Sequence, residues 1–179
     1  MKFLRFAKYF PSLSPKIAVA AIVVDMQTEF VKELRSGEAD RIIPKQLEII
    51  RDCNQSNIPI IVLELYRRKF GKTTKIIMNE VKKNPYFLLI QKEWNNGFRE
   101  TSLNKHLEFL GTKKIFIMGI NADFCVKETA EKAIELGYKI ITSNEVISGQ
   151  SDHSKDNSIN WFKSNGYCID RIDAFAKVV

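Results

Sequence analysis

The stretch KIFIMGINADFCVKETAEKAIELGYKI, residues 114–140, decides the fold class of this chain. An apolar, β-branched run at 114–120 is followed by apolar residues at helical spacing, and this pattern ends at Gly137. A second β-branched run begins at Lys139 and extends to residue 146. A strand, a helix and a strand in this order predict a right-handed parallel βαβ unit.

The rest of the chain repeats this alternation. Further strands are expected at 17–24, 58–65, 87–92 and 167–172, and further helices at 39–57, 101–114 and 151–167. The strands are almost continuously apolar, which is typical of strands covered on both faces of a parallel sheet. The sequence therefore predicts an α/β fold: a doubly wound, Rossmann-like, six-stranded parallel sheet flanked by helices.

The length of 179 residues corresponds to one ordinary domain, which we assign to residues 17–179. Residues 1–16 form an aromatic, basic N-terminal segment. We expect a strap whose side chains Phe3, Phe6 and Phe10 pack on the core. A helix that lies on a membrane surface is the alternative interpretation.

The charge and the cysteine content limit which binding partners and which cellular compartment can be expected. The net charge of +7 is scattered, and without a recognised nucleic-acid motif we expect no nucleic-acid partner. The three cysteines, Cys53, Cys125 and Cys168, lack disulfide-type spacing and favour a reducing compartment. Pro11 and Pro15 interrupt an N-terminus that superficially resembles a signal peptide. We expect a cytoplasmic protein that does not span a membrane.

Three reactive side chains follow three predicted strands. Asp25 comes after the first strand, Lys92 closes the run FLLIQK, and Cys125 comes shortly after KIFIMGI. Carboxyl ends of parallel strands lie at one edge of a sheet, so these side chains can converge there. Singly, each has an ordinary explanation: a helix cap, a solvated lysine and a buried inert thiol. Together, an acid, a base and a thiol suit nucleophilic acyl chemistry.

The expected position of Cys125 at a helix N-terminus bears on its ionisation. A free thiol has a pKa near 8.5, and helix amides and the Lys92 ammonium favour the thiolate, so we expect a lowered pKa. Asp25 can take the thiol proton and return it to a leaving amine. Backbone N–H groups in the turn before the helix can hold the oxyanion.

Three segments of the chain resemble the isochorismatase-like cysteine hydrolases, which include nicotinamidases and other amidases, and they follow one another in the same order as in that family. They are DMQTEF (25–30), the Gln-Lys of FLLIQKEW (87–94) and GINADFCVKETAEKAIELGYKI (119–140). The resemblance extends from about Ile17 to the final strand, and it includes NGFRETSLNKHL (96–107).

The resemblance implies an Asp25–Lys92–Cys125 triad and a homo-oligomer. It also implies a cis peptide between Ile120 and Asn121, which aims the Asn121 and Cys125 amides at the substrate oxygen as an oxyanion hole.

The chain departs from the nicotinamidases at their metal motif. They carry Asp-x-His after the second strand, whereas ELYRRKFGK (64–72) contains no histidine. The two histidines, His106 and His153, lack ligand spacing and are interpreted as surface or capping residues. We therefore expect no metal and no cofactor.

Several residues are candidates for substrate binding. Arg67 is a candidate clamp for a substrate carboxylate, with a solvent-facing role as the alternative. Gln27 either orients Asp25 or the substrate, or caps the next helix. Aromatic candidates for a pocket wall are Phe30, Trp94, Phe98 and Phe124, and core packing is the alternative for Phe30 and Phe98.

These observations predict a metal-independent cysteine hydrolase that cleaves a C–N bond of a small amide through a thioester on Cys125. One alternative is an enol-ether hydrolase of the isochorismatase type, although those enzymes dispense with the nucleophilic cysteine. Another is a non-catalytic binding protein with the same fold. A dinucleotide-binding protein requires a glycine-rich turn, which DMQTEF does not provide.

Overall fold

The computed structural model describes residues 18–66 and 68–175, so the predicted strap at 1–16 and Arg67 lie outside the described residues. The described strands form one parallel sheet in the order β3-β2-β1-β4-β5-β6. Their bounds are β1 Val19–Val24, β2 Ile60–Leu65, β3 Phe87–Lys92, β4 Lys114–Gly119, β5 Lys139–Ser143 and β6 Tyr167–Ile169. The predicted α/β fold with six parallel strands is confirmed.

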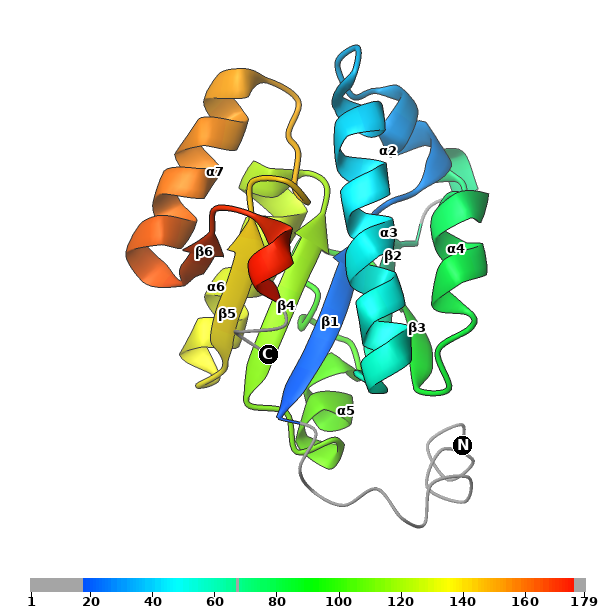
Figure 1. The fold of residues 1–179 in the computed structure, drawn as a ribbon, viewed down its shortest axis with the longest axis vertical. Coiled ribbons are helices and arrows are strands. Elements are labelled where there is room, and N and C mark those ends of the chain that lie inside the picture. Colours follow the sequence, from blue (N-terminus) through cyan, green and yellow to red (C-terminus); the bar gives the residue numbers. More distant parts are fainter. Residues whose placement is uncertain (1–17, 67, 176–179) are drawn as a thin grey trace.

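Helices cover both faces of the sheet (Figure 1). In that view α3 and α4 lie in front of the sheet, and α5 and α6 lie behind it. The helices are α2 Thr28–Lys32, α3 Glu38–Ser56, α4 Lys75–Val81, α5 Leu103–Phe109, α6 Lys127–Glu135 and α7 Asp152–Asn165, with short turns η1 Arg68–Phe70, η2 Ala122–Val126 and η3 Ile172–Ala174. The short helices α2 and α4 were not predicted, because α2 buries no residue and α4 buries only Ile77 and Val81.

The core lies along the central strands β1 and β4. All six residues of β1 are buried, as expected for a strand with helices on both faces. At the end of this pair Val24 lies beside Gly119, where a side chain would place its Cβ 2.1 Å from the Val24 carbonyl oxygen. Glycine is therefore required there, and it lets the chain leave β4 directly beside Asp25.

Local signals set where α6 ends. Gly137 adopts a left-handed conformation with φ of 89°, and its N–H donates to the Ile134 carbonyl. The Tyr138 N–H donates to the Ala133 carbonyl, which completes the cap. The glycine read from the sequence as a stop signal acts as one. Among residues 18–66 and 68–175, no helix has the length and apolarity needed to cross a bilayer.

Candidate active site

The structure brings together the three reactive residues at the carboxyl edge of the sheet. Asp25 directly follows β1, Lys92 is the last residue of β3, and Cys125 lies in the turn η2 after β4. Only 1% of Asp25, 1% of Lys92 and 5% of Cys125 is exposed to solvent. A buried aspartate, lysine and cysteine are thus gathered at the ends of three parallel strands.

Asp25 and Lys92 form a buried ion pair. Lys92 Nζ lies 2.6 Å from Asp25 Oδ2 and also donates to the Trp94 carbonyl at 3.2 Å. The second carboxylate oxygen, Asp25 Oδ1, has no hydrogen-bond partner among the described residues. Burial raises the pKa of Asp25, and the Lys92 ammonium opposes this shift. The carboxylate is therefore a stronger base than an ordinary aspartate, with one oxygen left to receive a proton.

The expectation of a lowered Cys125 pKa is wrong. Burial, followed by the charge of the Asp25 carboxylate, raises the pKa of the thiol to about 12, and Lys92 offsets this only in part. In addition, η2 is a π-helical turn in which the Val126 N–H donates to the Asn121 carbonyl, so Cys125 precedes α6. The thiol is protonated at neutral pH and requires a base during attack.

The peptide bond between Ile120 and Asn121 is cis. Backbone groups on either side of this bond are hydrogen-bonded to Ser148. The Ala122 N–H donates to the Ser148 carbonyl at 2.9 Å, and the Ser148 N–H donates to the Gly119 carbonyl at 3.2 Å. These two bonds join the turn that carries Cys125 to the loop after β5.

Sequence reasoning missed Asn95, which contacts the thiol directly. The Cys125 Sγ–H donates to Asn95 Oδ1 at 3.6 Å, and Asn95 Nδ2 donates to Glu128 Oε1 at 2.8 Å. The only available signal was its position, three residues after Lys92 on the same loop. Nothing in that sequence indicates that the loop folds back onto α6.

Comparison with known proteins agrees with this architecture. The isochorismatase domain family model matches residues 19–173. The chain belongs to the isochorismatase family.

Relatives and solved structures support the assignment. An isochorismatase family protein 1A of Dictyostelium discoideum is 22% identical over 88% of this chain and 76% of its own length. The nicotinamidase of Saccharomyces cerevisiae is 35% identical, over 42% of this chain and 38% of that enzyme. The crystal structure of the Staphylococcus aureus nicotinamidase shares the fold, with a TM-score of 0.76, 22% identity, and coverage of 85% of this chain and 98% of that one.

The residues at the nicotinamidase metal motif do not fit a metal site in this family member. Glu64 stands there without a histidine, and its Oε1 accepts the Thr73 N–H at 2.8 Å. His106 is buried on α5, so its predicted surface or capping position is wrong, and His153 is exposed on α7. Residues 18–66 and 68–175 contain no group of three or more His, Cys, Asp or Glu able to hold a metal ion.

The Gln27 side chain is hydrogen-bonded to the loop after β2. Its side chain is 1% exposed; Nε2 donates to the carbonyls of Leu65 and Gly71, and Oε1 accepts the Leu65 N–H. It makes no cap bond to α2. The capping role is therefore wrong, and the bonds of Gln27 fix the loop after β2 against the end of β1.

The four aromatic candidates separate into two pairs. Phe30 is half-buried and stacks on Phe70 at 4.3 Å, whereas Phe98 is buried and stacks on Tyr138. Both rings pack within the fold, which was the alternative interpretation, and Phe98 in addition lines a hollow beside α6. Trp94 and Phe124 are 41% and 46% exposed, so each is accessible to a ligand.

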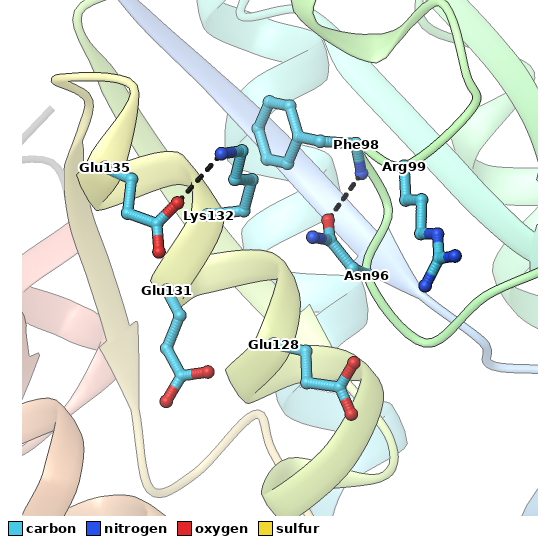
Figure 2. Close-up of a pocket in the computed structure, with 7 residues that line it drawn as sticks. All are labelled: Asn96, Phe98, Arg99, Glu128, Glu131, Lys132 and Glu135. Atoms are coloured by element: carbon cyan, nitrogen blue, oxygen red, sulfur yellow. Dashed lines mark hydrogen bonds and ion pairs between the residues drawn. The ribbon is translucent and has the colours of Figure 1, made fainter.

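A cavity of about 360 Å³ lies beside the thiol's neighbour Asn95. Its lining residues are Leu65, Glu93, Trp94, Asn95, Asn96, Arg99 and Glu128. The Arg99 guanidinium lies over the Trp94 ring at 3.7 Å. A second hollow of about 400 Å³ shares Asn96, Arg99 and Glu128 and extends along α6 (Figure 2). Its side chains Lys132 and Glu135 pair with each other.

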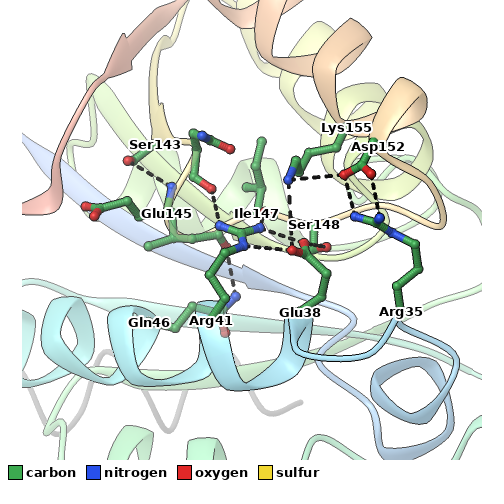
Figure 3. A network of polar contacts seen from close by, with 12 residues as sticks. Arg35, Glu38, Arg41, Gln46, Ser143, Glu145, Ile147, Ser148, Asp152 and Lys155 are labelled. Carbon is green, nitrogen blue, oxygen red and sulfur yellow. Dashed lines mark hydrogen bonds and ion pairs between the residues drawn. The ribbon is translucent and has the colours of Figure 1, made fainter.

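A polar network fixes the loop after β5, against which the Cys125 turn is bonded (Figure 3). Arg41 binds both oxygens of Glu38 and the carbonyls of Asn144 and Ile147, and the Ser148 hydroxyl donates to Glu38. The hydrogen bonds from Arg41 and Ser148 lower the pKa of Glu38 to about 2. This carboxylate is fully bonded and acts as a structural group.

Proposed function

We propose that this protein is a metal-independent cysteine hydrolase that cleaves a carbon–nitrogen bond of a small amide-type substrate through a thioester on Cys125. The observation that carries the proposal is the buried Lys92–Asp25 pair at 2.6 Å, with Asp25 Oδ1 free to take a proton and the Asp25 charge acting on the Cys125 thiol. The nicotinamidase relatives support amide hydrolysis as the reaction class.

The first half-reaction transfers the acyl group to sulfur. Asp25 takes the thiol proton while Sγ of Cys125 attacks the substrate carbonyl carbon. The amides of Asn121 and Cys125 stabilise the oxyanion that develops on the carbonyl oxygen. The C–N bond then breaks, and the nitrogen leaves with the proton from Asp25. Lys92 stabilises the Asp25 carboxylate at the beginning and end of this step.

The second half-reaction restores the enzyme. Water attacks the thioester carbon and gives a proton to Asp25, and the C–S bond breaks. Sulfur regains that proton, and the acid product leaves. The net reaction converts an amide and water into a carboxylic acid and an amine. The cavity of about 360 Å³ beside Asn95 lies in the size range of small-molecule sites.

The test is loss of turnover when the thiol is removed. A panel of small amides is screened for release of ammonia or amine, and Cys125→Ala and Cys125→Ser are assayed on any substrate found. We expect losses of at least about 10³-fold, because the thioester cannot form. Intact mass spectrometry of the wild type should show an acyl adduct.

The matched control is Cys168→Ala, which removes a half-buried thiol of β6 and should retain wild-type turnover. Turnover by Cys125→Ala at the wild-type rate would rule out the proposal.

A further inference from the structure

Asn95 contacts the Cys125 thiol but has no part in the proposed acyl transfer. Its side chain joins two groups: Oδ1 accepts the Cys125 Sγ–H at 3.6 Å, and Nδ2 donates to Glu128 Oε1 at 2.8 Å. Glu128 is half-buried and lines the cavity beside the site.

Glu128 determines which way the Asn95 amide faces. A carboxylate accepts hydrogen bonds and donates none, so it must receive the NH₂ group of Asn95. The amide carbonyl is thereby turned to Cys125. The thiol consequently faces an acceptor that has no proton to offer it.

The backbone around this contact is fixed by Thr129 of α6. The Thr129 hydroxyl accepts the Gly97 N–H at 2.9 Å and donates to the Cys125 carbonyl at 2.6 Å. Gly97 permits this approach, because a Cβ there would lie 2.5 Å from Leu63 Cδ1. Asn95 therefore has a defined position relative to the nucleophile.

An acceptor beside sulfur favours the thiol over the thiolate, since only the thiol has a proton to donate. The charged groups that act on Cys125 are Asp25, from the end of β1, and Lys92, from the end of β3, and each acts through its charge and through a side-chain hydrogen bond. The thiol therefore has two acceptors beside it, Asn95 Oδ1 at 3.6 Å and the Asp25 carboxylate.

We propose that Asn95, held in one orientation by Glu128, is a positioning residue that keeps the proton on the Cys125 sulfur in the substrate-free enzyme. The inference rests on the proposed function, in which Cys125 is the nucleophile. Its practical consequence is that the resting thiol is slow to react with electrophiles, and that altering the Asn95–Glu128 pair activates it.

The experiment measures alkylation of Cys125 by iodoacetamide at pH 8, followed by intact mass and peptide mapping, and needs no substrate. Asn95→Leu keeps the bulk and removes the acceptor; Glu128→Gln lets the Asn95 amide turn its NH₂ to sulfur. Loss of one hydrogen bond to the thiol corresponds to about three- to tenfold faster alkylation in each variant. Glu131→Gln is the matched control, because it removes a charge one turn further along α6 without touching Asn95, and should react at the wild-type rate.

Asn95→Asp separates this role from a loosened loop. A second carboxylate beside the thiol opposes ionisation, so alkylation at or below the wild-type rate is expected, whereas loosening would accelerate both Asn95 variants. Wild-type or slower rates in Asn95→Leu or Glu128→Gln, or a faster rate in Asn95→Asp, would overturn the inference. Because Glu128 is half-buried, its variant remains informative if Asn95→Leu folds poorly. Failure of the amidase proposal would instead be seen as turnover by Cys125→Ala.

Discussion

The protein contains two close carboxylate–cation pairs, and the pKa values of their two carboxyl groups are shifted in opposite directions. Asp25 pairs with Lys92 at 2.6 Å, and Glu38 pairs with Arg41 at 2.7 Å. Burial raises the pKa of Asp25, whereas the hydrogen bonds of Arg41 and Ser148 hold the pKa of Glu38 at about 2.

The difference lies in solvent and hydrogen bonding. The Asp25 and Lys92 side chains are 1% and 0% exposed, and Asp25 Oδ1 has no partner among the described residues. Glu38 and Arg41 are 10% and 32% exposed, and both oxygens of Glu38 are bonded. Desolvation without full hydrogen bonding leaves a basic carboxylate suited to proton transfer, whereas full hydrogen bonding leaves an inert structural one.

The largest effect is expected on activity from Asp25→Asn. An amide cannot take the thiol proton, so kcat/KM on an identified amide should fall by about 10²- to 10⁴-fold. Circular dichroism verifies the fold, and Asp40→Asn on the exposed side of α3 is the matched control. Undiminished turnover by Asp25→Asn would remove Asp25 from the mechanism.

Removing the cation of each pair compares their contributions to stability. Lys92→Met leaves a buried unpaired carboxyl group, and the free energy of unfolding should fall by about 3–5 kcal/mol. Arg41→Met leaves Glu38 within reach of water and should cost about 1–3 kcal/mol through lost hydrogen bonds. Urea unfolding at pH 7 measures both. A larger loss in Arg41→Met would contradict this ranking.

Replacing both members sharpens the contrast. Asp25→Asn with Lys92→Met removes two desolvated charges, so the inactive double variant should equal the wild type in stability or exceed it by up to about 4 kcal/mol. Glu38→Gln with Arg41→Met should be less stable than the wild type, because the carbonyls of Asn144 and Ile147 lose a donor. Thermal and urea unfolding at pH 7 measure the stability of both double variants. If both were less stable than the wild type, or both more stable, the contrast between the two pairs would be refuted.

The smallest effect is the pH dependence of the Glu38 contribution. Its pKa is lowered from 4.5 to about 2, so its stabilising effect is complete above pH 4.5 and disappears as the pH falls through about 2. The stability difference between wild type and Glu38→Gln should be full at pH 7 and progressively smaller between pH 4.5 and 2. Urea midpoints across this range provide the measurement. If the stability difference between wild type and Glu38→Gln grew as the pH fell, this prediction would be contradicted.

Much of the fold was predictable because its signals are local. The apolar runs ending in Asp25, Lys92 and Gly119 predicted parallel strands, and parallel strands bring their carboxyl ends to one edge. The predicted strand at 139–146 was too long, because the chain leaves β5 after Ser143 to form the loop bound by Arg41. The short helices α2 and α4 carry too few buried residues to give a periodic signal.

The sequence by itself determined the α/β class, the family resemblance and the three reactive residue types at strand ends. Only the tertiary structure decided their environment. It set the raised pKa of Cys125, the packing of Phe30 and Phe98, the loop contact of Gln27 and the orientation of Asn95 by Glu128. The physical reason is that strand and helix patterns arise from neighbouring residues, whereas desolvation and hydrogen-bond direction depend on residues tens of positions apart that meet only in the folded chain.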